Sequence, residues 1–177
     1  MKKYFKIIAA IGLFLAIASC TSQKSIPSAK VASLLENGEF TFMAERANPT
    51  NFDVINVMNS LPNAGSSRIL NLDYGYTVQV TKDELKVTLP YFGRMFSPSF
   101  DREKNSYRFT SKDFTVNKTP GKKGSSVYSF QIKDQPNIRK MFLEVFANGK
   151  SYLSVDSSDR QAISYDGYLM ENEAPKK

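Results

Sequence analysis

Two neighbouring stretches of the chain alternate between hydrophobic and polar residues with a period of two. They cover residues 70–80 and 85–91, and the polar residues 81–83 lie between them. Because successive side chains of a β-strand point to opposite faces of a sheet, each stretch would have one apolar face and one more polar face. Two such stretches joined by a short polar turn predict an antiparallel β-hairpin.

The elements before this hairpin follow from the same kind of pattern. Residues 28–37 carry apolar residues at helical spacing, which predicts a short helix capped by Ser28 and ended by a left-handed Gly38. Residues 40–44 alternate and predict a first strand. Residues 52–67 are ambiguous, because they begin with a helical stripe but contain poor helix formers, and within them residues 61–67 predict a loop.

The second half of the chain contains further short alternating runs. They are centred on residues 107–109, 114–116, 128–132, 152–155 and 163–169. Residues 141–147 are apolar on both faces apart from Glu144, which fits either a strand covered on both sides or a buried helix. The following Asn148 and Gly149 favour the strand, because an Asn-Gly pair supplies the positive φ angles of a tight hairpin.

About eight or nine short strands joined mostly by turns predict an all-β fold. We expect a single domain, an antiparallel meander that closes into a barrel-like or sandwich structure and has one short N-terminal helix. The barrel is favoured, because closure removes exposed strand edges. The 177 residues suffice for a sizeable core after removal of a leader.

The first twenty residues have the layout of a secretory signal peptide. Three lysines come first, residues 7–17 are nearly all apolar, and small residues then lead to Cys20. The apolar run is too short to span a bilayer core of about 30 Å. Residues 17–20 resemble the bacterial lipobox, which implies that Cys20 is lipidated and becomes the new N-terminus. An ordinary cleaved signal with an incidental Cys20 is the alternative.

The expected organisation is a signal peptide over residues 1–19, a lipidated tether over 20–27, a β domain over 28–170 and a polar tail over 171–177. Acyl chains contribute about 0.8 kcal/mol per buried CH₂, so several chains hold a protein durably on a membrane. Residues 21–25 lack the acidic run that directs some lipoproteins to the cell surface. We therefore expect a protein of the outer membrane that faces the periplasm, with surface display as the alternative.

The side-chain inventory excludes several kinds of chemistry. The chain has one Cys and no His, so intrachain disulfides, Ser-His-Asp or Cys-His catalysis and His-based metal sites are excluded. We expect no metal and no other cofactor. Three of the 24 basic residues lie in the leader, which leaves 21 against 17 acidic residues. This small surplus acts mainly on solubility, and without a basic stripe or RNA-binding signature we expect no nucleic-acid partner.

The segment Leu-Pro-Tyr-Phe-Gly-Arg is the most unusual sequence of the chain. It contains the candidate binding residues Tyr91, Phe92 and Arg94, and Phe96 follows it. An aromatic rim with one Arg suits a glycan, a lipid headgroup or a peptide carboxylate. The competing interpretation is a strand end, in which Pro90 marks an edge or bend and the Arg stacks on an aromatic ring.

Arg160 and Tyr165 complete the set of candidate binding residues. Arg160 precedes the last predicted strand, and Tyr165 lies within that strand. One hypothesis is that either residue meets Tyr91 or Arg94 across the fold and builds a single site. The alternative is a turn pinned by an ion pair between Asp159 and Arg160.

Four segments of the chain carry a family resemblance. They are residues 38–42, 89–94, 148–150 and 159–167. Taken in order, they resemble the domain of unknown function 4251 family of short lipoproteins from Bacteroides-type bacteria. That family has no assigned activity, so the resemblance implies a lipid anchor and a compact β domain, and nothing catalytic.

These patterns together predict a non-enzymatic lipoprotein. It is bound to the membrane through the lipid on Cys20, and its β domain binds a hydrophobic ligand, a glycan or an envelope protein. A structural or assembly lipoprotein without a small ligand is the alternative. A hydrolase that uses a pair of carboxylates is a third and less favoured possibility, and the sequence does not fix which of the candidates would pair, namely Asp73, Asp83, Asp101, Asp113, Asp156 and Asp166.

The lipobox gives a first testable prediction. Radiolabelled palmitate supplied to the producing cells should enter the protein, because acylation of Cys20 draws on cellular acyl chains. Autoradiography of the purified protein measures the incorporation. A protein that stays unlabelled would contradict the lipid anchor.

Overall fold

The computed structural model describes residues 26–60, 66–97 and 105–172. Within these residues the chain forms nine strands, three α-helices and one 3₁₀ turn. The strands are β1 (Phe40–Pro49), β2 (Thr77–Val80), β3 (Leu85–Leu89), β4 (Tyr107–Ser111), β5 (Phe114–Pro120), β6 (Ser126–Ile132), β7 (Ile138–Val145), β8 (Lys150–Ser157) and β9 (Ile163–Met170). The helical elements are α2 (Ser28–Asn37), α3 (Phe52–Ser60), α4 (Ser66–Leu70) and the 3₁₀ turn η2 (Lys122–Gly124).

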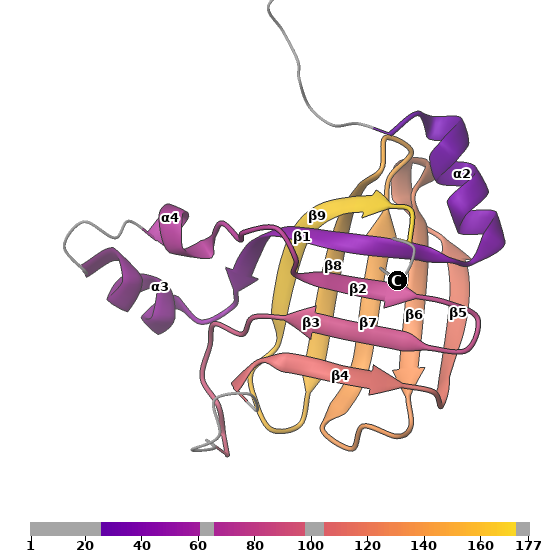
Figure 1. Ribbon diagram of the computed structural model, residues 1–177. Coiled ribbons are helices and arrows are strands. Elements are labelled where there is room, and N and C mark those ends of the chain that lie inside the picture. Colours follow the sequence, from indigo (N-terminus) through magenta and orange to yellow (C-terminus); the bar gives the residue numbers. More distant parts are fainter. Residues whose placement is uncertain (1–25, 61–65, 98–104, 173–177) are drawn as a thin grey trace, which may run out of the picture.

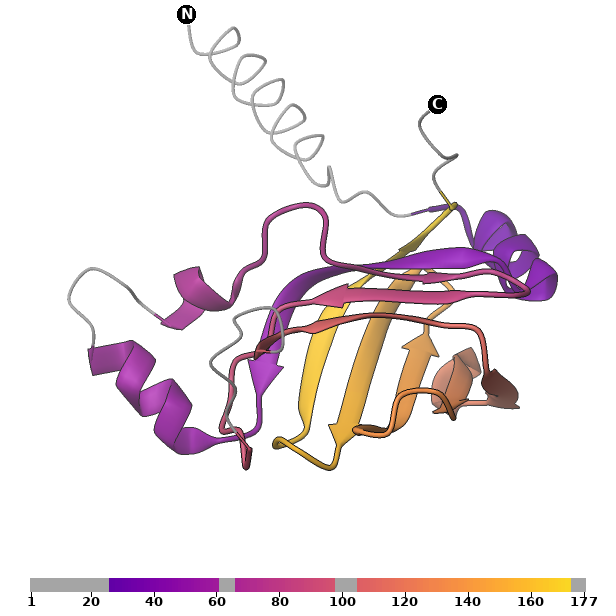
Figure 2. The ribbon, with the colours of Figure 1, turned by 60° about the horizontal axis from the view of Figure 1, so that its bottom comes forward.

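All nine strands belong to one antiparallel sheet with the order β4-β3-β2-β1-β9-β8-β7-β6-β5. Strands that follow one another in the chain are paired, except β4 and β5, which are the two edge strands, and the ladder between β1 and β9 joins the early strands to the late ones. Figure 1 shows β1 to β4 crossing in front of β5 to β9 at a steep angle, and Figure 2 shows the two groups from below. The sheet is therefore nearly closed and barrel-like, which confirms the predicted fold class.

A β-bulge in β1 helps the sheet turn from one group of strands to the other. The pairing of β1 with β9 shifts register between Ala44 and Arg46, so Glu45 is the extra residue. A bulge bends a strand and increases its local twist, and such bends form the corners where two layers of strands cross.

Gly167 permits the close approach of β9 to β1. It pairs with Ala44 in the ladder. A Cβ at position 167 would overlap the carbonyl oxygen of Met43 and would lie 2.9 Å from a ring carbon of Phe42. Only glycine therefore fits at this point of the ladder without displacing β1.

Hydrophobic side chains from both groups of strands fill the interior. The largest of these fully buried side chains are Tyr165, Phe40, Phe42, Phe130, Leu85, Leu89, Met141, Leu143, Leu153, Ile163 and Leu169. The rings of Phe40 and Tyr128 pack edge to face, with centroids 5.3 Å apart. The predicted alternation thus supplies a packed core, with dense contacts between the two layers.

Helix α2 packs against this core at one end of the sheet. Its Val31 and Leu34 are buried, and the Tyr128 hydroxyl donates a hydrogen bond of 3.1 Å to the carbonyl oxygen of Leu35. As predicted, the helix ends at a left-handed glycine: Gly38 has φ 69° and its N–H bonds the Leu34 carbonyl. The predicted Ser28 cap is wrong, because Pro27 holds the cap position and no side chain caps the helix.

The first half of the predicted hairpin is shorter than the sequence pattern indicates. Leu70 ends helix α4, and only Thr77–Val80 forms β2. Residues 71–76 still touch β1, since the N–H of Leu72 bonds the carbonyl of Glu45 and the carbonyl of Tyr76 accepts the N–H of Ala44. Six positions separate Asn71 from Thr77, whereas three separate their partners Arg46 and Met43 on β1. The extra residues form a loop beside β1, so the alternation continues without a continuous strand.

The structure decides the two stretches that the sequence left ambiguous. The helical stripe forms α3 over Phe52–Ser60. The predicted loop over residues 61–67 is wrong at Ser66 and Ser67, which begin α4, and its residues 61–65 lie outside the described part of the chain. Residues 138–145 are strand β7, so the strand interpretation was right and the buried helix was wrong. The turn after β7 has Gly149 at φ 81°, and its N–H bonds the carbonyl of Phe146, as in a hairpin with a left-handed final residue.

Substitution of Gly167 tests the role assigned to it. Gly167→Ala should lower the free energy of unfolding by at least about 2 kcal/mol, because the added methyl overlaps backbone that cannot move freely. Urea denaturation of the purified protein measures the change. Ser154→Ala, on the outer face of the neighbouring strand β8, is the matched control and should stay within about 0.5 kcal/mol of the parent. Equal stability of the Gly167→Ala variant and the parent would refute the packing argument.

Candidate functional site

Three of the predicted binding residues come together in the fold. The guanidinium carbon Cζ of Arg160 lies 5.1 Å from the ring centroid of Tyr91 and 5.0 Å from that of Tyr107. Tyr165 lies beside them, and its hydroxyl donates a hydrogen bond of 2.6 Å to the carbonyl oxygen of Pro90. The predicted meeting of Arg160 and Tyr165 with the segment around Tyr91 is thus confirmed.

The charge of Arg160 is balanced inside this group. Its Nη2 lies 2.8 Å from Oδ2 of Asp159, and its Nε also donates to both carboxylate oxygens. Only 7% of Arg160 is exposed. A buried guanidinium needs an anionic partner and is further stabilised over aromatic faces. Tyr91, Tyr107, Asp159, Arg160 and Tyr165 are called the tyrosine–arginine cluster below.

The cluster ties the segment after β3 to the loop between β8 and β9. The Tyr91 hydroxyl points at the carbonyl oxygens of Arg94 and Gln161, at 2.9 and 3.1 Å. The hydroxyls of Tyr107 and Ser157 are 3.0 Å apart and share a hydrogen bond. Early and late strands are therefore held together at this end of the sheet, which gives the cluster a structural role.

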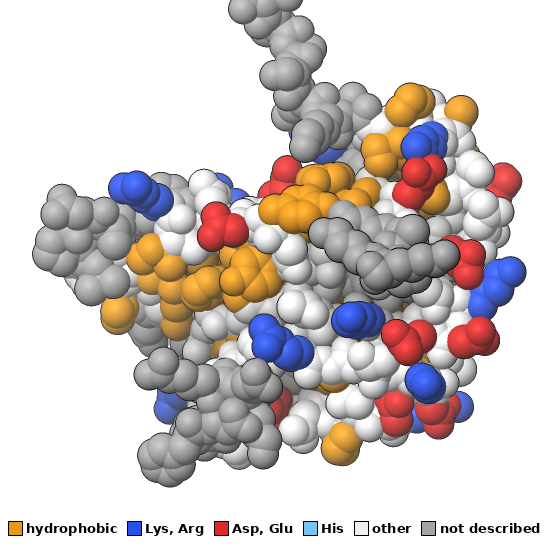
Figure 3. Space-filling model, viewed as in Figure 1, with side chains coloured by type: hydrophobic (Ala, Val, Ile, Leu, Met, Phe, Trp, Pro, Cys, Tyr) orange, Lys and Arg blue, Asp and Glu red, His pale blue; other side chains and the backbone are white. Residues whose placement is uncertain are grey.

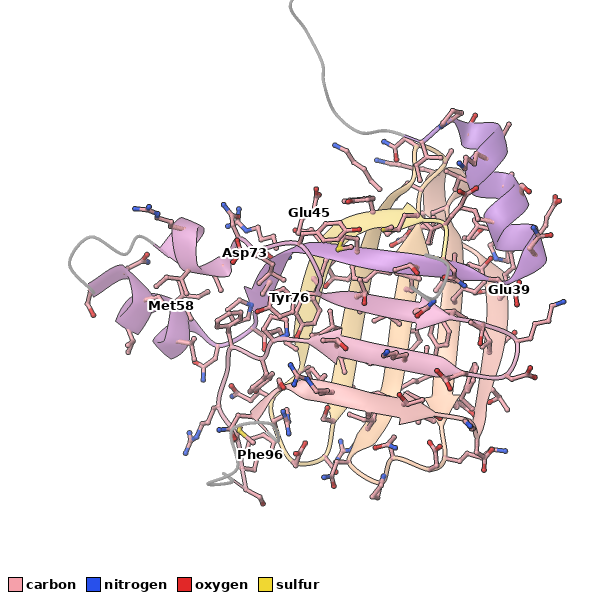
Figure 4. The ribbon with its side chains drawn as sticks, in the orientation of Figure 1. Glu39, Glu45, Met58, Asp73, Tyr76 and Phe96 are labelled. Carbon is pink, nitrogen blue, oxygen red and sulfur yellow. The ribbon has the colours of Figure 1, made fainter. Side chains whose placement is uncertain are left out.

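The remaining predicted residues lie around the cluster. Phe92 is half-buried against the core. Arg94 is exposed, and its carbonyl oxygen accepts the N–H of Gln161 at 3.1 Å. Phe96 is 59% exposed while its N–H bonds the carbonyl of Asp159, and Figure 4 shows it far from Glu45. Binding of a ligand by Tyr91, Phe92, Arg94, Phe96, Arg160 and Tyr165 stays a prediction, because the described contacts join these residues to the protein itself.

Burial changes the acidity of the cluster. It raises the pKa of Tyr107 from its ordinary 10.0 to about 12, against the hydrogen bond from Ser157 and the charge of Arg160, which lower it. Burial raises the pKa of Tyr165 well above its ordinary value, and the nearby Tyr107 adds to the shift. Burial would lower the pKa of Arg160, but the pair with Asp159 more than compensates and the pKa is raised. All three groups keep their neutral-pH charge.

A second feature, which the sequence pattern did not reveal, is an open groove on the outside of the sheet. It has a volume of about 1110 Å³ and runs over side chains of β1, β9 and β8 that point away from the core. Aromatic and aliphatic residues from several elements line it, namely Ile26, Met43, Tyr74, Phe146, Tyr152 and Tyr168. Its charged residues are Glu45, Asp73, Lys123, Lys150 and Asp166.

The aromatic side chains of the groove are accessible to a ligand. Tyr74 is 69% exposed, Tyr152 40% and Phe146 36%. Tyr168 is more enclosed, and burial followed by the charge of Glu45 raises its pKa. The alternation of β8 and β9 places Tyr152 and Tyr168 on the outer face of the sheet, so the sequence already indicated that these side chains point outward. The sequence did not indicate that β8 pairs with β9 and so brings these two tyrosines together.

The groove is bounded by fixed backbone. Tyr152 pairs with Asp166, and Lys150 pairs with Tyr168, in the ladder between β8 and β9. The Asn48 amide donates a hydrogen bond of 2.8 Å to Oδ2 of Asp166. Figure 4 shows Glu45 and Asp73 near the start of β2. These side chains therefore project from rigid strands, which favours a preformed binding surface.

The described residues contain no cluster of metal ligands and no membrane-spanning helix. Within residues 26–60, 66–97 and 105–172, no three Asp, Glu, Cys or His side chains are arranged to hold a metal ion. No helix of this described part of the chain is both long and apolar enough to cross a bilayer. The predicted signal peptide and Cys20 lie outside the described residues.

The raised pKa of Tyr107 predicts a loss of stability in alkali. An unfolded Tyr ionises near pH 10 and the folded one near 12, so the stabilisation is complete below pH 10 and disappears as pH rises to 12. A shift of this size corresponds to about 3 kcal/mol. Tyr107→Phe should therefore show a smaller fall in the free energy of unfolding between these pH values, in urea titrations at each pH. Phe142→Leu, at an exposed position, changes no titrating group and should keep the slope of the parent. Parallel curves for Tyr107→Phe and the parent would disprove the prediction.

This chain resembles a protein family and a solved structure of that family. A comparison with curated proteins gives no match. Among solved structures, the chain is similar to a DUF4251 family protein from Bacteroides eggerthii, with 12% identity and a TM-score of 0.47 over 83% of this chain and 89% of that chain. The profile of the family described as domain of unknown function DUF4251 matches residues 23–169. The chain therefore belongs to the DUF4251 family.

Proposed function

We propose that this chain is a non-enzymatic lipoprotein of the outer membrane that binds an envelope component in its outer groove. The lipid on Cys20 holds it to the membrane, and the β domain faces the periplasm, with the cell surface as the alternative location. The groove takes a hydrophobic ligand, a glycan or a segment of an envelope protein. The observation that carries the proposal is the aromatic groove beside Ile26, six residues after Cys20.

The lining of the groove supports binding. Tyr74, Phe146 and Tyr152 present a large apolar surface that water covers in the free protein. Carboxylates and ammonium groups lie around these rings, so polar groups of a ligand also find partners. A groove of about 1110 Å³ is large enough for a ligand of several rings or an extended chain.

The residue types in the groove support binding more than catalysis. The chain has no His, and its sole Cys belongs to the proposed lipid anchor. The groove contains Glu45, Asp73 and Asp166, and Asn48 already bonds Asp166. A glycosidase needs two carboxyl groups at a fixed separation across the substrate, with one pKa raised by its surroundings. A hydrolase is therefore less well supported than a binding protein.

A second candidate function is an assembly role without a small ligand. Helices α3 and α4 project from the body of the sheet, as Figures 1 and 2 show. Val57 of α3 is 61% exposed, and Met58 and Tyr76 are only partly buried. Figure 3 shows hydrophobic side chains gathered over these helices and the start of β2. Because the interior of the sheet is filled, this exposed patch favours a protein partner at the helices.

Native mass spectrometry of the protein purified from its own cells tests the proposal. We expect the lipidated chain to retain an additional bound mass, and Tyr152→Ala combined with Phe146→Ser to lose it, because these changes remove the accessible rings of the groove. Phe142→Ser is the matched control, since Phe142 is 39% exposed on the same strand that leads to Phe146 but lies outside the groove. Retention of the same mass by the groove variant would argue against this site.

A further inference from the structure

We infer that the groove docks onto the lipid surface to which the anchor holds the chain, with zwitterionic headgroups as its partner. Its aromatic side chains would lie at the level of the headgroups. Its lysines would meet the phosphate of a headgroup, and its carboxylates the ammonium group. This inference rests on the lipid anchor of the proposed function and names the partner of the same groove.

The length of the tether limits how far the groove can lie from the membrane. Ile26 lines the groove and is six residues after Cys20. Six peptide units span at most about 22 Å, whatever their conformation. The headgroup layer on one side of a bilayer takes about 5–8 Å of this distance. The side of the domain that carries Ile26 is therefore held close to the lipid surface.

The neighbouring elements place the rest of the groove on the same side. Gly149 is in contact range of Ile26, since a Cβ there would lie 3.7 Å from the Ile26 Cβ. The pairing of Ser126 with Val145 places the turn η2 next to the turn after β7. Lys123 and Phe146 belong to these two turns and both line the groove. Helices α3 and α4 lie at the other side of the sheet from α2 in Figures 1 and 2, so the tether does not favour their patch as the lipid contact.

The aromatic residues suit an interface between water and lipid. Tyrosine has an apolar ring and a polar hydroxyl, and it is enriched where membranes meet water. The groove presents Tyr74, Tyr152 and Tyr168, together with Phe146 at the tip of a hairpin. Tyr152 and Phe146 expose 40% and 36% of their surface. Contact with the acyl boundary would remove this apolar surface from water.

The charges of the groove have both signs and are ordered along it. Lys150 is opposite Tyr168 in the ladder, at the end near the hairpin turn, and Lys123 lies on the adjacent turn η2. Asp166 lies two residues before Tyr168 in β9, opposite Tyr152. The backbone bond between Leu72 and Glu45 brings Asp73 to the same end as Glu45. A purely anionic surface would attract the two lysines but would be repelled by the three carboxylates. A zwitterionic headgroup suits both, because its phosphate can pair with the lysines and its ammonium group with the carboxylates.

The ion pairs among the described residues do not use these charges. Those found among the described residues join Lys30 to Glu171, Lys133 to Asp113 and Arg160 to Asp159. None of the three uses a charged residue of the groove. A headgroup therefore competes with water for the charges of the groove, and no ion pair of this part of the chain has to break first.

Photolabelling of the anchored protein tests the inference. The full chain, processed by its producing cells, is reconstituted into vesicles of phosphoethanolamine lipid that contain a small share of the same lipid with a photoreactive group below the headgroup. Peptide mass spectrometry then locates the labelled residues. We expect label at Phe146, Tyr152 and Tyr168, and none at Phe142, which is equally exposed on β7 but outside the groove.

Paired variants separate the groove from general surface charge. Lys123→Glu with Lys150→Glu should reduce groove labelling severalfold, up to about tenfold. Lys112→Glu with Lys133→Glu, which makes the same charge change at the opposite turns, should leave it unchanged. Vesicles of phosphoglycerol lipid, which lack the ammonium group, should label the groove less than phosphoethanolamine vesicles.

The outcomes distinguish this inference from the proposed function. A chain without lipid mass that stays off the vesicles overturns both, because the anchor is then absent. A lipidated and vesicle-bound chain whose groove is unlabelled, or labelled no more than Phe142, overturns only the docking. Equal or stronger labelling in phosphoglycerol vesicles overturns the assignment of zwitterionic headgroups.

Discussion

The ladder between β1 and β9 is the constraint on which the rest of this structure depends. It is the pairing that joins the early strands β1 to β4 to the late strands β5 to β9. It requires glycine at position 167, where any side chain would meet the backbone of Met43, and a bulge at Glu45 that turns the strand. Because the two groups of strands then cross, their apolar faces enclose one filled core. Without this ladder, each group would expose a hydrophobic face to water.

Closure of the sheet divides its tyrosines into those that point inward and those that point outward. Tyrosines that point inward, such as Tyr107 and Tyr165, lie with Arg160 in a cluster that fastens the loops at one end. Their polar atoms bond the protein itself, so their contribution is to stability. Tyrosines that point outward, such as Tyr152 and Tyr168, line the groove and meet water. The same residue type therefore stabilises the fold on the inner face of the sheet and lines the groove on the outer face, according to the direction of its side chain.

Both described ends of the chain lie at one side of the sheet, which connects the anchor with the groove. Lys30 pairs with Glu171 at 3.0 Å, and the Thr41 hydroxyl donates to the side-chain oxygen of Asn172 at 2.8 Å. These contacts fix the start of α2 beside the end of β9. Under the proposed lipid anchor, a tether that leaves from this point would keep the outer face of β9 and β8 near the membrane, because few residues separate Ile26 from Cys20. The fold thus couples the position of the proposed lipid to the orientation of the binding surface.

The sequence by itself determined the local features of this protein. Alternation with a period of two predicted most strands, Gly38 and Gly149 marked the end of α2 and the hairpin after β7, and the residue inventory excluded histidine chemistry, since each of these follows from backbone geometry or composition. Only the tertiary structure decided that residues 71–76 leave the ladder, that Arg160 is enclosed by Tyr91 and Tyr107, and that a groove lies across β1, β9 and β8. These features join residues far apart in the chain, and a period of two specifies which face a side chain takes but not which strand lies beside it.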